Sequence, residues 1–307
     1  MRVLFFGTPA FAVPTLRSLL DAGHDVAAVV TQPDRPQGRS RSILVPSPVK
    51  EVARSHRIPV HQPDRPVGDL FAETLRRAQA DLGVVVAYGH ILRPEILAIP
   101  PKGMINVHAS LLPRWRGAGP IQATILAGDT LAGISVMQME AGLDSGPVLL
   151  REPTPVGKEE TAGELADRLA QLGAQALLES VELIAKGEAY FEPQDGSAAT
   201  LAPKISREVA RLDWRTPATS LARAIRAFDP VPGAWAPLDG QTVKFHRARP
   251  VAGSGSPGTV LAAGDTLRVA TGEGAVEIRE VQPAGKRRMP VAEWVRGRGV
   301  AEGGRFA

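Results

Sequence analysis

The residues most able to do chemistry lie in two short stretches of the sequence, 104–117 and 142–147. Asn106 and His108 are two positions apart, so on a β-strand both side chains face the same side and can converge on one atom. An amide can donate a hydrogen bond to a developing oxyanion, and an imidazole can accept a proton near neutral pH. Together these groups suit acyl transfer that needs no covalent nucleophile.

A carboxylate would complete this pair by orienting the imidazole or by relaying its proton. Asp144 is the natural candidate, because its Gly-Leu-Asp-Ser-Gly-Pro turn follows the strand-like run 133–139. Taken alone, each of the three residues has a plainer interpretation. Strand-end histidines are often structural, and Asn and Asp are frequent turn formers. The residues by themselves therefore leave the catalytic and the structural interpretations open.

Other common chemistries find less support in the sequence. The six histidines show no spacing typical of metal ligands, and the chain has no cysteine, so neither a metal site nor a thiolate nucleophile is expected. The glycine patterns that bind dinucleotides or phosphates do not follow the first apolar run, where Phe-Gly-Thr-Pro-Ala-Phe stands at 6–11. Ser110 lacks the Gly-x-Ser-x-Gly elbow of serine hydrolases, so we expect it to donate hydrogen bonds rather than to attack.

Short apolar runs alternate with helical patterns over the first half of the chain. Continuous apolar strands between helices are typical of a parallel sheet covered on both faces, so the predicted class is α/β. Such sheets bind ligands beyond the carboxyl ends of their strands, which is where Asn106 and His108 would lie. The predicted strands span 2–7, 26–31, 82–89 and 104–109, and the predicted helices span 10–22, 48–55 and 119–127.

The second half begins with a long helix and ends in short β runs. Residues 161–186 start with a capping box at Thr161 and Glu164, and Gly187 can end the helix. The polar stretch with Gly and Pro that follows is predicted to be a linker. A second helix is predicted at 217–228, and the close spacing of the β runs after it suggests a small barrel or sandwich. These runs lie at 242–246, 258–262, 266–271 and 275–282.

Charge is small in total but unevenly distributed. The formal net charge is +4, yet residues 207–307 hold 16 Lys and Arg against 10 Asp and Glu. Such an excess attracts polyanions such as nucleic acid, although a solvated basic face is the commoner explanation. No apolar run approaches the roughly 18 residues of a membrane span, and a chain without cysteine suits the cytoplasm.

A family resemblance is carried by the stretches that hold the candidate catalytic residues. The run Asn-Val-His-Ala-Ser-Leu-Leu-Pro-Arg-Trp-Arg-Gly at 106–117, followed by Pro-Ile-Gln at 120–122 and the turn at 142–146, resembles the formyltransferase family. Members of this family take a one-carbon unit from 10-formyltetrahydrofolate. Other parts of the chain resemble the branch that acts on methionine-charged tRNA. These parts are 32–36 with Gly38-Arg39 and 46–50, then 226–228, then 282–286.

The resemblance implies a two-domain fold and two substrates. A Rossmann-like catalytic domain, with a mostly parallel sheet and helices on both faces, is expected over 1–189, a linker over 190–206, and a C-terminal OB-like β-barrel that binds tRNA over 207–307. The expected substrates are 10-formyltetrahydrofolate, as co-substrate, and methionyl initiator tRNA. We expect a monomer that needs no metal, does not enter membranes and works in the cytoplasm.

The resemblance also implies roles for particular residues. The loop 32–48 matches an insertion that reaches the acceptor end of initiator tRNA, and its arginines suit phosphates. Interpreted without the family, the same segment is a mobile polar loop. The expected catalytic residues are Asn106, His108 and Asp144, the expected folate-binding residues are Ser110, Leu111, Leu112 and Pro113, and the expected tRNA-binding residues are Arg39, Arg41 and Lys286.

The chain departs from the family pattern at three places. Ser-Arg-Ser-Ile at 40–43 stands where Gly-Lys-Lys-Leu is frequent, which leaves open which loop residues touch RNA. His90 stands where an aliphatic residue is usual. Two interpretations are open, a residue that lines the folate cleft and a bystander, and we favour the bystander. Val231 stands where an aromatic residue is frequent, which bears on the packing between helix and barrel.

Two other functions compete with this interpretation. Formylation of a small amine, such as a nucleotide or an amino sugar, would use the same catalytic domain but leave the basic C-terminal region without a use. A non-catalytic RNA-binding module would not need Asn106, His108 and Asp144 together. The dependence of substrate affinity on ionic strength distinguishes tRNA from a small amine, because binding through phosphates weakens steeply as the salt concentration rises.

Overall fold

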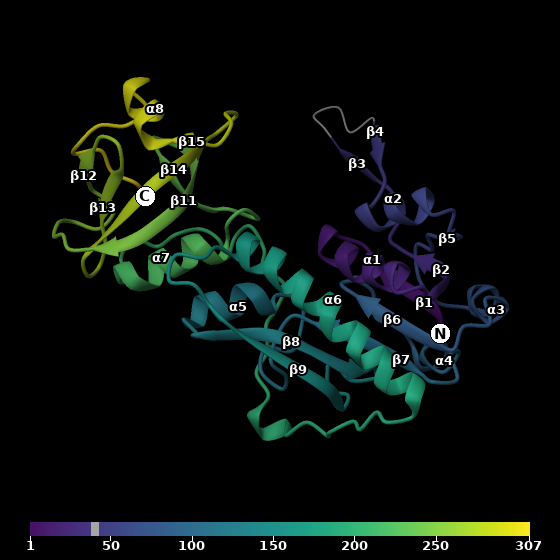
Figure 1. Cartoon of the computed structure of the whole chain (residues 1–307). Helices are drawn as coiled ribbons and strands as arrows, with labels where there is room; N and C mark the ends of the chain where they lie inside the picture. Colours follow the sequence, from purple (N-terminus) through teal and green to yellow (C-terminus); the bar gives the residue numbers. More distant parts are fainter. Residues whose placement is uncertain (38–42) are drawn as a thin grey trace. The chain divides into compact units, whose positions relative to one another are not determined.

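The computed structural model describes residues 1–37 and 43–307. The described chain forms two compact units, each built around a sheet of its own (Figure 1). The first unit comprises 1–118, 132–154 and 166–201, and the second comprises 119–131, 155–165 and 202–307.

The described part of the first unit contains a seven-stranded sheet in the order β5-β2-β1-β6-β7-β8-β9. Strands β5, β2, β1, β6 and β7 pair in parallel, and β8 runs antiparallel to β7. The prediction of a mostly parallel α/β sheet is therefore confirmed. The strands are β1 (Arg2–Gly7), β2 (Asp25–Val30), β5 (Val60–His61), β6 (Leu82–Val86), β7 (Met104–His108), β8 (Leu131–Gln138) and β9 (Val148–Pro155).

Helices cover both faces of this sheet, and β7 shows how. Met104 belongs to a buried cluster with residues of α3 (Asp69–Arg77) and α4 (Pro94–Leu97). Val107 points to the opposite face, where its Cγ1 would lie 2.9 Å from a Cβ added to Gly173 of α6 (Ala162–Lys186). Since successive strand residues alternate between faces, Asn106 and His108 share the face of Met104. The other helical elements of the described first unit are η1 (Ala10–Ala12), α1 (Val13–Asp21), α2 (Pro48–Ser55) and η2 (Gly196–Ala198).

The ends of α6 follow the predicted capping chemistry. The Thr161 N–H donates to the Glu164 carboxylate at 2.9 Å, and the Glu164 N–H donates to the Thr161 hydroxyl at 3.3 Å. Gly187 takes a φ of 74° just after the helix, a conformation that favours glycine. The capping box and the glycine stop are both confirmed.

The second unit has an antiparallel sheet in the order β10-β11-β14-β13-β12, with β15 beside β14. The N–H groups of Phe306 and Ala307 donate to the carbonyls of Gly258 and Pro237 at 2.9 and 3.0 Å. These bonds join the two edges of the sheet and close it into a barrel, as expected. The strands are β10 (Ala234–Leu238), β11 (Gln241–Val251), β12 (Val260–Ala263), β13 (Leu267–Ala270), β14 (Ala275–Pro283) and β15 (Met289–Pro290).

An aromatic cluster fills the barrel. The rings of Trp214, Phe245 and Phe306 have centroids 5.1–5.4 Å apart, and Phe245 packs edge-to-face against both of the others. The helices of the second unit are α5 (Pro120–Ala127), α7 (Ala218–Ala227) and α8 (Val291–Arg296). Val231, whose departure from the family pattern was expected to bear on packing here, is 71% exposed.

Candidate active site

Asn106 and His108 lie at the carboxyl end of β7, where the sheet pattern places a binding site. Asn106 is half-buried, whereas His108 is only 6% exposed. Both side chains lie on the same face of the strand, as their spacing predicts. The neighbouring residues Ile105 and Val107 are buried on the other face and hold the strand in place.

The His108 ring faces an oxygen atom at each of its nitrogens. Its Nε2 lies 3.0 Å from the Trp115 carbonyl oxygen, and its Nδ1 lies 3.7 Å from Asp144 Oδ2. The second distance is too long for a hydrogen bond but within reach of an ion pair if the ring carries a proton on both nitrogens. A neutral ring can donate to only one of these oxygens, whereas an imidazolium can donate toward both. The ring therefore lies between two acceptor oxygens, one on the main chain and one on a carboxylate.

Asp144 is held in place by the main chain of a neighbouring loop. Its Oδ2 accepts a hydrogen bond from the Gly117 N–H at 2.8 Å. Asp144 has a φ of 47°, in the left-handed region that Asp tolerates better than most residues. Two residues on, a Cβ added to Gly146 would lie 1.9 Å from the Gln138 carbonyl oxygen, so only glycine fits there. The turn is therefore closely fixed, and its aspartate points toward His108.

Gln194 ties the two loops of the site together, and sequence reasoning missed it. Its Nε2 donates to the carbonyls of Asp144 and Gly146 at 2.9 and 2.7 Å. Its Oε1 accepts from Nε and Nη2 of Arg116 at 3.1 and 2.8 Å. A second residue of the same segment, Thr200, accepts a hydrogen bond from the Trp115 N–H at 2.9 Å. The segment that the sequence suggested as a linker thus supports both loops around His108.

The expected folate-binding residues form the loop that follows β7. Ser110 is buried, its hydroxyl donates to the Arg114 carbonyl at 2.6 Å, and its carbonyl accepts from the Ser135 hydroxyl at 2.7 Å. Leu112 is buried against Met137, whereas Leu111 and Pro113 are half-buried. Ser110 and Leu112 shape the loop, and contact with folate by the four residues stays a prediction.

The predicted tRNA-binding residues Arg39 and Arg41 lie outside the described residues. The base of their loop is described as a hairpin of β3 (Arg35–Gln37) and β4 (Ile43–Val45). Just beside it, the buried Lys50 donates to the Asp34 carboxylate at 2.6 Å and lowers the pKa of that group. Polar contacts therefore anchor the hairpin where it leaves the sheet.

His90 follows Tyr88 at the carboxyl end of β6. The two rings have centroids 5.4 Å apart, and burial raises the pKa of Tyr88 to about 12. His90 is half-buried, and neither of its nitrogens takes part in the hydrogen bonds around His108. The interpretation of His90 as a bystander stays a prediction.

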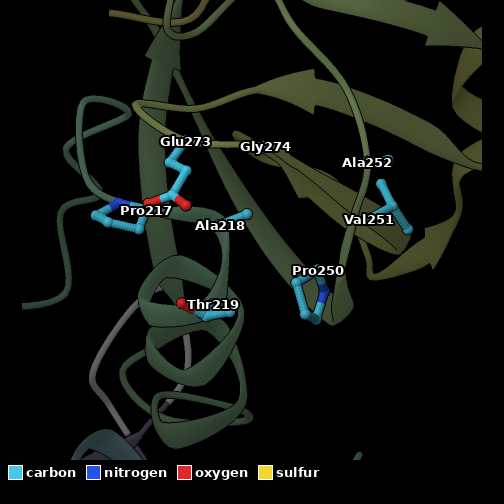
Figure 2. Close-up of a pocket in the computed structure, with 8 residues that line it drawn as sticks. All are labelled: Pro217, Ala218, Thr219, Pro250, Val251, Ala252, Glu273 and Gly274. Carbon is cyan, nitrogen blue, oxygen red and sulfur yellow. The ribbon is translucent and has the colours of Figure 1, made fainter.

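The second unit contains the third predicted tRNA-binding residue and a separate cavity. Lys286 is exposed in the turn after β14, and its carbonyl accepts a hydrogen bond from Gln282 at 3.1 Å. This pocket is an open hollow of about 350 Å³ next to the start of α7, and its one ionisable side chain, Glu273, makes no catalytic set (Figure 2). Its lining residues are Pro217, Ala218, Thr219, Pro250, Val251, Ala252, Glu273 and Gly274.

Residues 1–37 and 43–307 contain neither a cluster of potential metal ligands nor a membrane-spanning helix. No group of three or more potential His, Asp or Glu ligands gathers there. No helix in these ranges is both long and apolar enough to cross a bilayer.

The chain is similar to known proteins over both of its halves. The family model described as formyl transferase matches residues 1–181, and the model of the formyl transferase C-terminal domain matches residues 204–299. The methionyl-tRNA formyltransferase of Stutzerimonas stutzeri is 52% identical over 288 residues, covering 93% of this chain and 91% of the relative. That of Aromatoleum aromaticum is 48% identical over 307 residues, covering 100% and 97%.

Among solved structures, the N-formyltransferase from Helicobacter canadensis, in complex with folinic acid and dTDP-3-aminofucose, has a similar fold. It superposes with a TM-score of 0.67 at 14% identity and covers 92% of this chain and 98% of its own. At that identity the likeness concerns the fold alone.

Proposed function

The chain belongs to the formyl transferase family, and we propose that it transfers a formyl group from 10-formyltetrahydrofolate to the α-amine of methionine on initiator tRNA. One observation carries the choice of substrate. Relatives named methionyl-tRNA formyltransferase share about half of their residues with this chain over both of its units. Similarity restricted to the catalytic half would not indicate which molecule accepts the formyl group. Here the similarity also includes the basic C-terminal barrel.

Asn106, His108 and Asp144 are the residues to which we assign the chemistry. The amine nitrogen attacks the formyl carbon, the bond from that carbon to folate nitrogen breaks, and one amine proton ends on the folate nitrogen. The Asn106 amide donates to the formyl oxygen as it becomes an oxyanion. His108 moves the proton, and the Asp144 carboxylate stabilises the imidazolium across the 3.7 Å separation.

The Trp115 carbonyl occupies one nitrogen of the His108 ring. It accepts the hydrogen bond of His108 Nε2, so that nitrogen must exchange the carbonyl for a substrate atom during turnover. Thr200 holds the Trp115 N–H, which limits how far the carbonyl can move. We therefore assign Trp115 the role of keeping His108 oriented between turnovers.

Each assigned group is expected to be worth about 10²- to 10³-fold in rate, as for other oxyanion donors and positioned acid-base groups. We further propose that the protein works as a monomer in the cytoplasm and that the domains run over 1–189 and 207–307, joined by 190–206. The family model of the first domain ends its match at residue 181, and the model of the C-terminal domain begins its match at residue 204, which supports such a division.

The direct test is transfer of labelled formyl from 10-formyltetrahydrofolate to methionine-charged initiator tRNA, with free methionine in a parallel reaction. Product on charged tRNA, with none on free methionine, is the expected result. Folate turnover with a small amine, and no formylated tRNA, would overturn the choice of acceptor while keeping the site. No turnover with either would overturn the assignment of a formyl transfer.

A further inference from the structure

The loop that follows His108 returns to it through the Trp115 carbonyl, whose oxygen lies 3.0 Å from His108 Nε2. A carbonyl oxygen can only accept a hydrogen bond, so the hydrogen of this bond belongs to Nε2. In a neutral ring, Nδ1 then carries the lone pair, on the side where Asp144 Oδ2 lies at 3.7 Å. The direction of one main-chain carbonyl therefore decides which nitrogen of His108 holds the hydrogen.

Thr200 fixes the direction of that carbonyl from both sides of Trp115. Its Oγ1 accepts a hydrogen bond from the Trp115 N–H at 2.9 Å, and its carbonyl accepts one from the Arg116 N–H at 2.8 Å. The Arg116 N–H and the Trp115 carbonyl belong to the same peptide unit, and in a planar trans unit they point in opposite directions. Because the N–H is directed at Thr200, the carbonyl is directed away from Thr200 and toward His108.

Trp115 needs this support because its backbone is strained. Its φ is 62°, in the left-handed region, which costs free energy for a bulky side chain. A residue in this region persists only where its surroundings hold it there. The Thr200 N–H also donates to the Pro113 carbonyl at 3.3 Å, so three hydrogen bonds join this one residue to the loop. All of these residues belong to the first unit.

The beginning of the loop is held by a different residue. Ser135 on β8 is directly opposite His108 on β7. Its hydroxyl donates to the Ser110 carbonyl at 2.7 Å and accepts from the Leu112 N–H at 3.0 Å. The loop thus has one anchor where it leaves the strand and another, Thr200, where it returns to the ring. Loss of the second anchor should leave the first in place.

We propose that Thr200 is a positioning residue for formyl transfer, which holds the Trp115 carbonyl on His108 Nε2 and so keeps the hydrogen of the neutral ring on that nitrogen. With its hydrogen on Nε2, the ring can exchange one acceptor for another, so that an acceptor atom of the substrate takes the place of the carbonyl. A ring with its hydrogen on Nδ1 would offer the substrate a lone pair instead. The role rests on the proposed function, but the link between Thr200 and the ring exists in the protein without substrates.

The first experiment observes the ring directly, in the full-length protein without substrates. Two-dimensional NMR of protein with isotope-labelled histidine rings shows which nitrogen carries the hydrogen, and a His108→Gln sample identifies the His108 signals by their absence. Spectra are recorded where further addition of base no longer changes them, so that the ring is neutral. The wild type should show the form with hydrogen on Nε2. Thr200→Val, which removes Oγ1 but keeps the branched shape, should show a mixture of both forms.

Two further variants control for other causes. Thr200→Ser keeps the hydroxyl and should give the wild-type spectrum, a rescue that identifies Oγ1 as the cause. Ser197→Ala removes an exposed hydroxyl of the same segment, which donates to Asp195 at 2.7 Å, and should leave both the spectrum and kcat unchanged. Thermal unfolding of each variant separates these effects from loss of the fold.

Steady-state kinetics with methionine-charged tRNA and 10-formyltetrahydrofolate gives the second measurement. Thr200→Val should lower kcat by about tenfold, because a misplaced catalytic group slows the chemical step. KM for both substrates should stay within about twofold, since Ser135 still holds the start of the loop. Thr200→Ser should bring kcat back to within about twofold of the wild type.

The outcomes separate this role from the proposed function. A wild-type ring with its hydrogen on Nδ1, or a Thr200→Val spectrum identical to that of the wild type, would overturn the positioning role. An unchanged kcat in Thr200→Val, or a fall that Thr200→Ser does not restore or that Ser197→Ala shares, would overturn it as well. The expected change in the His108 spectrum, in a wild-type protein that transfers no formyl group, would overturn the proposed function while the hold of Thr200 on the ring would stand.

Discussion

The two units use polar residues in opposite ways. Around His108, the polar groups are buried or half-buried and form hydrogen bonds with one another. Gln194 by itself contributes four of these bonds and links two loops. On the barrel, Arg207 and Arg211 are exposed, and their guanidinium carbons lie 5.5 and 5.7 Å from the centroid of the Trp235 ring. Chemistry on a formyl group requires atoms held within fractions of an ångström, whereas phosphate binding requires charge in roughly the right place.

This contrast predicts that changes around His108 lower kcat at constant tRNA affinity. Replacing His108 with alanine should have the largest effect, a fall in kcat of about 10²- to 10³-fold, because proton transfer loses its carrier. Steady-state kinetics with charged tRNA measures the fall, and tRNA binding at equilibrium should stay within about twofold, as for residues outside an interface hot spot. A variant with normal kcat would remove His108 from the catalytic set.

Asp144→Asn should have the next largest effect, about 10²-fold in kcat, because it removes the charge that stabilises the imidazolium. The amide oxygen can still accept the Gly117 N–H, so the turn should keep its shape. Crystallography of the variant checks that shape beside the kinetics. If the loop is intact and kcat is unchanged, Asp144 serves only as a turn residue.

Gln194→Met should lower kcat by about tenfold, because methionine fills the space but cannot form the hydrogen bonds that fix the Asp144 turn. Glu192→Gln is the control, since it alters an exposed ion pair with Arg151 in the same segment and should leave kcat near the wild-type value. The ratio of kcat between these two variants is the measurement. Equal values would mean that Gln194 has no positioning role.

Asp229→Asn should have the smallest effect on kcat and act on stability instead. Burial opposes the charge of Asp229, but the His246 ring, whose Nδ1 lies 3.1 Å from Oδ1, and the Arg288 guanidinium, which donates to both carboxylate oxygens, outweigh it and lower the pKa of this carboxyl. A lowered pKa means stability that is present above the ordinary Asp value of about 3.9 and is lost as pH falls through the folded-state pKa. The free energy of unfolding of the variant should be lower than that of the wild type by about 1 to 3 kcal/mol at pH 7.

Thermal unfolding from pH 7 down to pH 3 tests the sign of that effect. The gap in Tm between wild type and Asp229→Asn should narrow below about pH 4, because there the unfolded chain takes up a proton on this carboxyl while the folded protein still keeps it ionised. A gap that stays constant or widens toward acid would contradict the lowered pKa.

Much of the first unit could be predicted because its pattern is local. The apolar runs before Gly7 and around Val107 are strands within a residue or two of the predicted bounds. Strand β9 was not predicted, because an edge strand reading Val-Leu-Leu-Arg-Glu-Pro-Thr-Pro mixes exposed and buried positions without a clear period. Helices α3 and α4 were also missed, since α4 has only four residues and α3 carries mostly polar ones.

The site was only partly predictable for a related reason. Asn106 and His108 are close in sequence, so their shared face follows from strand geometry. Gln194 lies 50 positions after Asp144 in the sequence, and the fold brings the two together. No local sequence pattern encodes such a contact. Likewise, the stacking of Arg207 on Trp235 joins residues 28 positions apart. A charge excess could indicate that the barrel region is basic, but it could not show which cations lack a carboxylate.

The closure of the barrel by residues 303–307 also bears on solubility. The edge strands β10 and β12 present main-chain groups that would pair with any strand they met, and the bonds from Phe306 and Ala307 occupy the edge at Gly258 and Pro237. A chain that lost these few residues would keep its active-site sequence yet expose two open edges. Such a chain should self-associate into aggregates during expression, even though no catalytic residue had changed.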